Sequence, residues 1–503
     1  MSPHNSTAQP AMQPPASGVT VRMYNPGFGD CLLLAFRAQD DSARYMLIDF
    51  GVYHTYPGRE ERIQLLARDI VKATAHHLHV VVATHEHTDH LYGFKYGKEI
   101  LDDVEIDDLW LAWTEDPTDP VAQQLKQLYG LRIRALTAAV NQLRLANAPL
   151  AGRLQGVLDF EFPDALTATG DKSAQLEYLR TKSKKKLHKP EDYRCPGEAP
   201  LTLPGVQGVK VYVLGPPKNV DLIKKLQKES ELYPELTAMN EVGAFAAAAL
   251  AAGGTDSREG EDEEFIERSR PFDKSDERSE ISKDRAPAHS RYGRFFRRTY
   301  GFSGERGHGP AWRRIDTDWL AAAEQLALDI NGKTNNTSLV LAIELTETQP
   351  RKVLLFAADA QVGNWLSWHK LSWPGEGQGS PAVTVEDLLR RTVLYKVGHH
   401  GSRNATLSSK GLEMMKSADL VAMIPVDQKW ANAGGWEHPA EKLLDRLTEK
   451  ARGRIIRTDK IPSGNEPPEK PEKITEEEWQ AFIEQLDWDR SPDRLWVQYT
   501  VSG

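Results

Sequence analysis

The chain has 503 residues, of which 40% are hydrophobic and 27% charged, and its formal net charge is −9. This composition is ordinary for a folded globular protein, and the acidic balance gives the whole chain no electrostatic attraction to nucleic acid. Two cysteines are too few for a disulfide framework, and no apolar run reaches the roughly eighteen residues of a membrane span. We therefore expect a cytoplasmic protein.

The N-terminal third predicts an alternation of strands and helices. Residues 1–17 are polar and rich in proline, serine and glutamine, which favours a disordered tail and excludes a secretory signal. Apolar and β-branched runs predict strands, and spaced apolar residues predict helices. The expected strands are 19–24, 31–36, 45–50, 80–83 and 104–113, and the expected helices are 60–77 and 121–145.

A histidine-rich segment follows the buried strand 80–83 directly. It reads Thr84-His85-Glu86-His87-Thr88-Asp89-His90, so two histidines project to the same side if the chain stays extended, and an Asp-His pair follows. Imidazole and carboxylate ligands suit zinc, manganese or iron, and the lack of cysteine here argues against a structural thiolate site. The alternative, an exposed turn with chance histidines, is much the weaker interpretation. The segment predicts a metal site.

The second half of the chain contains an insertion and a further set of strands. Residues 218–315 interrupt the pattern, and 253–289 are charged, poor in aromatics and aperiodic, which predicts disorder. Residues 461–503 form a charged C-terminal extension with a last strand over 495–501. Other strands are expected over 209–214, 337–345, 352–356, 392–397 and 420–425, and short helices over 385–390 and 440–450.

Two basic clusters deserve separate interpretations. Residues 182–189 are lysine-rich, and the cluster either contacts phosphates or, as we favour, is a solvated loop. Residues 291–298 interleave arginines with aromatic side chains, which is how single-stranded nucleic acid is often held. We favour the other interpretation, in which these aromatics pack on the core while the arginines stay in solvent.

Ordered motifs carry a resemblance to a known family. The His-x-His-x-Asp-His segment resembles the signature loop of the metallo-β-lactamase-fold hydrolases. The accompanying motifs are similar to those of the branch that includes the hydrolase domain of ComEC/Rec2 DNA-uptake proteins. They are Asn25-Pro26-Gly27-Phe28-Gly29-Asp30-Cys31, Leu47-Ile48-Asp49-Phe50-Gly51, Asn335-Asn336-Thr337-Ser338, Phe356-Ala357-Ala358-Asp359 and His399-His400-Gly401-Ser402. The resemblance implies an α/β fold, the αββα four-layer sandwich, over residues 18–460.

The resemblance also implies a ligand set for two divalent metal ions, zinc or manganese. In this assignment His85 and His87 hold one ion, Asp89 and His90 hold the other, and Asp359 bridges both. Either His399 or His400 completes the second site, and the spacing leaves open which of them does. Asp49 would lie beneath residues 84–90, which we call the metal loop. A simple turn at the end of the strand explains Asp49 equally well.

The chemistry expected of such a site is hydrolysis. A hydroxide bridging the two metals would be the nucleophile, and the catalytic roles fall to Asp89, Asp359 and His438, with His438 or a spare aspartate protonating the leaving group. We expect a phosphodiester substrate, with DNA and RNA among the candidates. The alternatives are a lactone, lactam or thioester hydrolase with the same site, or a metal-bound scaffold or sensor whose insertion binds a protein partner.

Overall fold

The computed structural model describes residues 11–145, 174–225, 322–375, 377 and 379–503, and four isolated positions, 152, 154, 155 and 158. The predicted disordered stretch 253–289 and the arginine-rich segment 291–298 lie outside the described residues. The chain divides into two compact units. One comprises Met1–Leu125, Phe160–Leu236 and Asn331–Gly503, and the other comprises Lys126–Asp159 and Thr237–Ile330. Both large sheets and all of the predicted metal ligands belong to the first unit.

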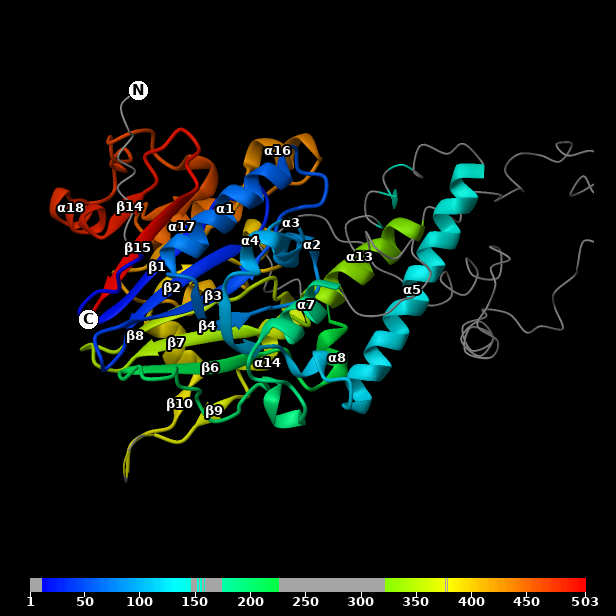
Figure 1. Cartoon of the computed structure of the whole chain (residues 1–503), viewed down its shortest axis with the longest axis horizontal. Helices are drawn as coiled ribbons and strands as arrows, with labels where there is room; N and C mark the ends of the chain where they lie inside the picture. The colour runs from blue at the N-terminus through cyan, green and yellow to red at the C-terminus, as the bar shows by residue number, and fades with distance from the viewer. Residues whose placement is uncertain are drawn as a thin grey trace, which may run out of the picture. The chain divides into compact units, whose positions relative to one another are not determined.

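A seven-stranded mixed sheet contains the N-terminal strands (Figure 1). Its order is β14 (Leu486–Trp488), β15 (Trp496–Ser502), β1 (Gly18–Tyr24), β2 (Cys31–Arg37), β3 (Ala43–Phe50), β4 (His77–Val82) and β5 (Glu105–Trp110). Pairing is antiparallel from β14 to β3 and parallel from β3 to β5. Residues 461–503, expected as an extension, thus supply two strands of this sheet.

A six-stranded sheet is built from the later part of the chain. Its order is β13 (Ile455–Arg457), β12 (Val421–Ile424), β11 (Thr392–Lys396), β8 (Lys352–Phe356), β7 (Val340–Leu345) and β6 (Val209–Gly215). Pairing is parallel from β13 through β12 and β11 to β8, and antiparallel from β8 through β7 to β6. A two-stranded ribbon, β9 (Ser372–Trp373) with β10 (Val383–Thr384), is separate.

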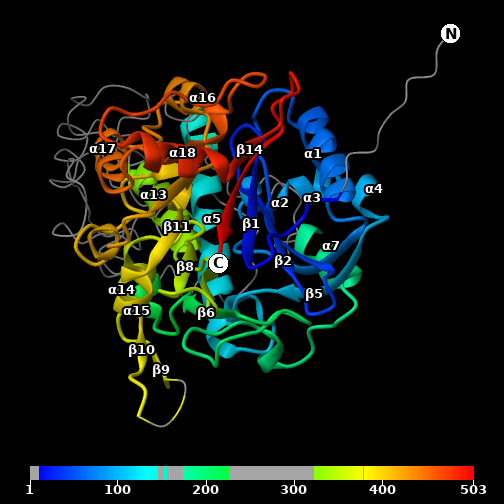
Figure 2. The same ribbon diagram turned by 90° about the vertical axis from the view of Figure 1, so that its left-hand side faces the viewer.

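The two sheets face each other across one apolar core, and helices cover their outer faces. Along β2, Leu32, Leu34 and Phe36 join the core between the sheets, while Leu33 and Ala35 pack on the helix side. Because side chains alternate across a strand, a strand buried on both faces is apolar at successive positions, as β2 is from Cys31 to Phe36. Figure 2 shows the first sheet with α1 on one side and the second sheet with α14 and α15 on the other.

The helices of the first unit connect the strands or follow them. They are α1 (Arg59–Ala73), α2 (Thr88–Leu91), α3 (Gly93–Tyr96), α4 (Lys98–Leu101), α7 (Ala174–Lys182), α8 (Val220–Ile223), α14 (Val362–Trp368), α15 (Val385–Arg390), α16 (Gln428–Ala433), α17 (Glu441–Lys450) and α18 (Glu476–Glu484). Two further helices, α5 (Pro120–Leu145) and α13 (Ala322–Asn335), extend into the second unit. Among the described residues, no helix is both long enough and apolar enough to cross a membrane.

The N-terminal segment differs from its expectation. Residues 11–17 pack on the protein instead of belonging to a disordered tail, because Met12 is buried and its backbone N–H donates to the carbonyl of Ala73 (2.8 Å). The hydroxyl of Tyr45 also donates to the carbonyl of Met12 (2.8 Å). An apolar side chain and two hydrogen bonds therefore hold a segment whose polar composition had predicted a free tail. Residues 1–10 lie outside the described part.

Candidate metal centre

The predicted ligands follow the ends of three strands, each of which is parallel to at least one neighbour. The histidine-rich segment follows β4, Asp359 follows β8, His399 and His400 follow β11, and Pro425 follows β12. Parallel strands bring their carboxyl ends to the same edge of a sheet, which is where α/β proteins commonly bind ligands. The topology therefore gathers residues that lie more than three hundred positions apart in sequence.

The backbone at this edge adopts a sparsely populated conformation. Asp49, Ala358, His399 and His400 all have positive φ, at 55°, 47°, 46° and 52°. Non-glycine residues rarely take this left-handed region, at a cost of about 1–3 kcal/mol each, and such residues concentrate at functional sites. Four of them at the ends of β3, β8 and β11 indicate a site whose side-chain directions are held by the surrounding fold.

Gly51 lets the metal loop lie against the end of β3. A Cβ atom at Gly51 would stand 2.0 Å from the carbonyl oxygen of Asp89, so no other residue fits there without moving the loop. The loop is also held by hydrogen bonds, since Asp30 N–H donates to Asp89 O (2.8 Å) and Gly51 N–H donates to Asp30 O (2.9 Å). The glycine-containing motifs of the sequence thus position the loop backbone.

The first group of potential ligands comprises His85, His87 and Asp359, all buried, with ligand atoms within 4.8 Å of one another. His85 Nε2 lies 2.9 Å from His87 Nδ1 and 3.9 Å from Asp359 Oδ2. Two nitrogens that share an ion at about 2.0–2.1 Å are about 2.9 Å apart at a right angle and about 3.3 Å apart at the tetrahedral angle. The spacing of the two imidazoles fits such a shared ion.

A hydrogen-bond chain assigns the tautomer of His85. Thr84 Oγ1 donates to Asp49 Oδ2 (2.7 Å), because a carboxylate only accepts, and its oxygen is then free to accept from His85 Nδ1 (3.1 Å). The proton sits on Nδ1, and the Nε2 lone pair faces the ligand group. Burial, followed by the neighbouring His90, lowers the pKa of His85 well below its usual value, which favours this neutral form.

The second group comprises Asp89, His90, Asp359 and His400, again all buried. His90 Nδ1 donates to Asp49 Oδ2 (2.8 Å), and its Nε2 lies 3.2 Å from Asp359 Oδ1. An imidazole anchored to a carboxylate through one nitrogen while the other points inward is typical of metal-ligating histidine. Asp49 therefore supports the metal loop from beneath.

His400 shows the same arrangement. Its Nδ1 must donate to the carbonyl oxygen of Pro425 (2.7 Å), and its Nε2 faces Asp89 Oδ2 at 2.8 Å. Two groups that both offer lone pairs approach this closely only if a proton or a cation lies between them. Although burial opposes it, the hydrogen bond to Asp89 and the charge of Asp30 raise the pKa of His400. A bound metal ion would replace that proton.

His399 differs from His400 in its surroundings. Its Nε2 lies 3.7 Å from Asp359 Oδ2, its Nδ1 has no hydrogen-bond partner among the described residues, and its side chain is partly exposed. No outer hydrogen bond orients its ring as Pro425 orients that of His400. The geometry therefore groups His400 with the other potential ligands and favours it over His399 for the choice that spacing in the sequence left open.

Asp359 belongs to both groups, as expected for a bridging ligand. Both of its carboxylate oxygens are fully buried, and in the described part of the chain neither has a hydrogen-bond partner of good geometry. Oδ1 faces the second group and Oδ2 faces the first. An ionised carboxylate with neither oxygen satisfied is costly in a protein interior unless cations compensate it.

Four fully buried carboxylates meet at the centre, those of Asp30, Asp49, Asp89 and Asp359. Within the described residues one buried ammonium, that of Lys396, accompanies them and pairs with Asp30. Although burial opposes it, Asp359 and Asp89 together raise the pKa of His90 well above its usual value. The excess of buried negative charge fits a binding site for divalent cations.

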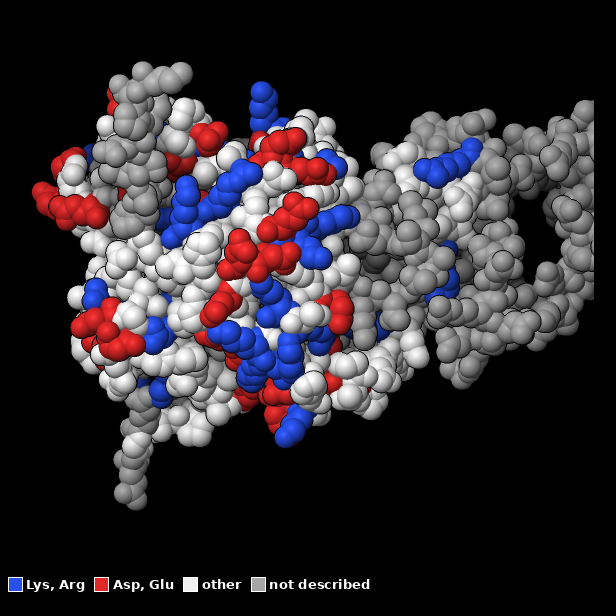
Figure 3. Space-filling view, in the orientation of Figure 1, with Lys and Arg blue, Asp and Glu red and all other residues white. Residues whose placement is uncertain are grey.

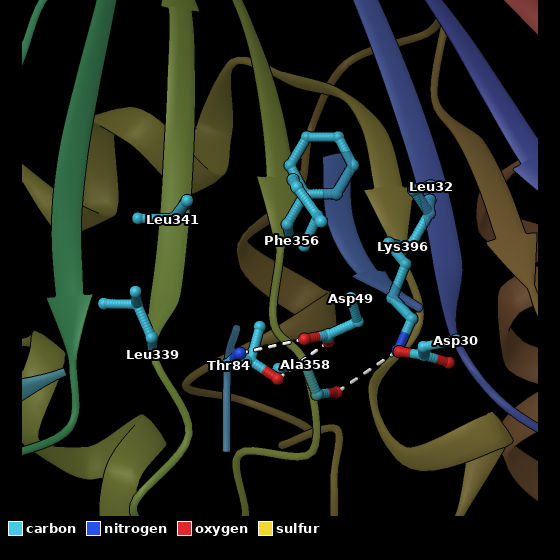
Figure 4. A pocket seen from close by; sticks show the side chains of 10 residues that line it. Asp30, Leu32, Asp49, Thr84, Leu339, Leu341, Phe356, Ala358 and Lys396 are labelled. Carbon is cyan, nitrogen blue, oxygen red and sulfur yellow. Dashed lines mark hydrogen bonds and ion pairs between the residues drawn. The ribbon is translucent and has the colours of Figure 1, made fainter. Parts of the chain in front are cut away.

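A cavity of about 10 Å³ lies beneath the centre, between the two sheets (Figure 4). Figure 4 shows Asp30, Asp49, Thr84 and Lys396 at one end of it and apolar side chains at the other. This volume holds about one water molecule and is far too small for a substrate. Among the predicted ligands, His399 is the one whose side chain is partly exposed, at 15%.

His438 adjoins the rim through His399, with ring centroids 5.5 Å apart. Burial, followed by the nearby His399 and His400, lowers the pKa of His438 well below its usual value. The neutral imidazole donates or accepts a hydrogen bond but is a weak general acid. Protonation of a leaving group by His438 thus stays a prediction that its surroundings do not favour.

Some residues of the centre carry no motif in our sequence analysis. Lys396 is the clearest, and the available signal was a charged residue inside the otherwise uncharged strand 392–397. Ser338, by contrast, belongs to the Asn335-Asn336-Thr337-Ser338 motif, and its Oγ accepts from the backbone N–H of Asp359 and lies 3.3 Å from His85 Nδ1. Asn336 holds the same loop, because its Oδ1 accepts from the N–H groups of Gln361 and Asn364.

The lysine cluster is engaged within the chain. Lys184 pairs with Glu105 (2.8 Å) and Asp107 (3.0 Å), and Lys185 pairs with Asp108 (3.1 Å). Basic and acidic side chains are likewise intermixed on the face shown in Figure 3. The contacts of these lysines secure the edge strand β5, which supports the interpretation as a surface loop over that of a phosphate grip.

Comparison of the chain with protein-family models, curated proteins and solved structures yields no match.

Proposed function

We propose that this chain is a dinuclear metal-dependent hydrolase of the metallo-β-lactamase architecture, acting on phosphodiester bonds. The observation that carries the proposal is the position of Asp359, whose two buried, unsatisfied oxygens face separate sets of imidazoles. The helix-covered pair of sheets and the ordered motifs support the architecture. The two free cysteines agree with a reducing compartment such as the cytoplasm.

The ligands would divide between two ions. His85 and His87 would hold one, and Asp89, His90 and His400 the other, with Asp359 shared. Two divalent ions in such a site supply an activated water at neutral pH and stabilise the negative charge that develops on a phosphoryl group. Asp49 and Pro425 orient the imidazoles, and Lys396 offsets part of the buried negative charge.

The residues at the rim would handle the substrate. His399 Nε2 lies 3.7 Å from Asp359 Oδ2, and the ring of His438 lies 5.5 Å from that of His399. From these positions both side chains would hydrogen-bond a phosphoryl or leaving oxygen. A degenerate scaffold or sensor would have lost ligands, whereas the described site retains carboxylates and imidazoles for both ions. The intact ligand set therefore favours catalysis over a purely structural metal site.

The experiment is a hydrolysis screen of the purified full chain. Single-stranded DNA, RNA and bis-p-nitrophenyl phosphate would be offered with zinc or manganese, beside a lactone, a lactam and a thioester. We expect diester cleavage that chelation abolishes and added metal restores. Cleavage of only the acyl substrates would reject the phosphodiesterase assignment, and no metal-dependent cleavage of any substrate would reject the hydrolase.

A further inference from the structure

An aromatic strip lies beside the metal centre. It consists of Phe28, Tyr53, Trp430 and Trp436. Phe28 is buried and contacts His400, with ring centroids 4.1 Å apart, and Trp430 contacts Phe28 at 5.1 Å. Tyr53 packs against both tryptophans, at 5.0 and 5.1 Å. The strip is continuous from a predicted metal ligand to the protein surface.

A second route of ring contacts leads to the same place. Trp436 lies 6.4 Å from His438, and His438 lies 5.5 Å from His399, again measured between ring centroids. His399 is the partly exposed histidine at the rim of the centre. Trp436 therefore flanks the side from which a substrate would reach the ligands.

The two tryptophans of the strip differ from those that only stabilise the fold. Trp365, Trp368 and Trp373 are buried, and each donates its indole N–H to a protein oxygen. Trp430 and Trp436 are partly exposed, and within the described residues neither indole N–H has a hydrogen-bond partner. Each ring packs against its neighbours in the strip and leaves a partly exposed aromatic surface and a free donor.

The strip is also rigidly supported. Asp427 accepts hydrogen bonds from the backbone N–H of Trp430 (2.9 Å) and from the hydroxyl of Tyr56 (2.8 Å). At the start of the same helix, Asp459 accepts from the N–H of Gln428 (3.0 Å) and pairs with Arg457. Residues 457–459 therefore brace α16, which carries Trp430.

Resting on the proposed function, we propose that this strip binds a nucleobase, so that the substrate is a phosphodiester of a nucleoside. Planar bases stack on aromatic side chains, and their polar edges use donors such as the indole N–H. The alkyl chain of a lipid ester would leave those donors unpaired beside an apolar group, which is unfavourable. The chemistry of the strip thus favours a base over a lipid tail.

The test compares two substrates that share a leaving group. Thymidine 5′-(p-nitrophenyl) phosphate carries a base, and methyl p-nitrophenyl phosphate does not. With the metal-loaded full chain we expect at least about tenfold higher kcat/KM for the nucleoside ester. Trp436→Ala and Trp430→Ala should remove most of that preference through KM, in line with the loss of one stacking contact. Trp436→Tyr should retain it.

Controls separate stacking from stability and from the proposed function. Tyr178→Ala removes a surface aromatic on α7 and should leave both substrates unchanged. Equal losses on both esters in the Trp436 variants, or no preference in the parent chain, would overturn the base-binding role while leaving the phosphodiesterase standing.

If the parent chain hydrolyses neither ester, the proposed function is wrong. The base-binding role of the strip is then tested by ligand binding alone. Calorimetry would then compare thymidine 5′-monophosphate with 2-deoxyribose 5-phosphate. We expect tighter binding of the nucleotide and loss of that difference in Trp436→Ala. Equal affinities of the parent chain for the two ligands would overturn the role of the strip.

Discussion

Asp49 offers the sharpest single perturbation of the metal loop. Its Oδ2 accepts from His90 Nδ1 (2.8 Å) and Thr84 Oγ1 (2.7 Å), and its Oδ1 accepts from Thr84 N–H (2.8 Å). In Asp49→Asn one of these oxygens becomes an NH₂ donor of nearly the same size. If the NH₂ group takes the place of Oδ2, it faces two donors, His90 Nδ1 and the hydroxyl of Thr84. If it takes the place of Oδ1, it faces the backbone N–H of Thr84.

The magnitude follows from the orientation of His90. To avoid a contact between two donors, the proton of His90 would move from Nδ1 to Nε2, the nitrogen that faces Asp359. The lone pair that a metal needs on Nε2 would then be lost. Removing such an outer hydrogen bond typically lowers metal affinity about 10- to 100-fold, or about 1.4–2.8 kcal/mol. An unpaired buried polar group would also lower the free energy of unfolding by about 1–3 kcal/mol.

The assay is a competition titration of zinc and of manganese against a chelator, with chemical unfolding of the metal-free protein in parallel. Asp69→Asn is the matched control, since Asp69 accepts from Arg22 and from the hydroxyl of Tyr24 but contacts no predicted ligand. It should lower stability and leave metal affinity unchanged. If Asp49→Asn behaves like Asp69→Asn, with normal metal affinity, the argument from tautomers is refuted.

Three further outcomes are expected. Gly51→Ala should displace the loop at Asp89 and abolish metal binding measured by calorimetry, and a variant that binds normally would contradict the close approach. Burial, then His77, lowers the pKa of His79 to about 4, so the unfolded chain binds more protons between pH 6.5 and 4. As the pH falls from 6.5 to 4, the free energy of unfolding of the parent chain, measured with urea, should therefore decrease by about 1–2 kcal/mol more than that of His79→Gln. Parallel pH profiles of the two proteins would refute this. Replacing Lys184 and Lys185 by alanine should leave cleavage of DNA and RNA unchanged, and a selective loss on polymers would restore the phosphate interpretation.

Much of the strand pattern could be predicted from local sequence. The expected strand 352–356 matches β8 residue for residue, and the expected helix 385–390 matches α15. Both are short runs with clear boundaries, where the hydrophobic period and flanking polar residues carry the information. The gathering of the histidine-rich segment with Asp359 was likewise expected, although only through the resemblance.

Other features depend on contacts that no local pattern contains. The distinction between His399 and His400 depends on the carbonyl of Pro425, which the neighbouring strand β12 delivers. The pairing of Lys396 with Asp30 joins the two sheets, so neither residue reveals it alone. The aromatic strip similarly combines the turn before β2 with α16.

The central claim is that Asp359 is shared by two metal ions, and metal analysis tests it most directly. Inductively coupled plasma mass spectrometry of the purified full chain, saturated with zinc or manganese and then desalted, should give about two ions per chain. Asp359→Ala should retain at most one ion and lose metal-dependent diester cleavage, while circular dichroism remains that of the parent. Two ions and full activity in Asp359→Ala would contradict the account.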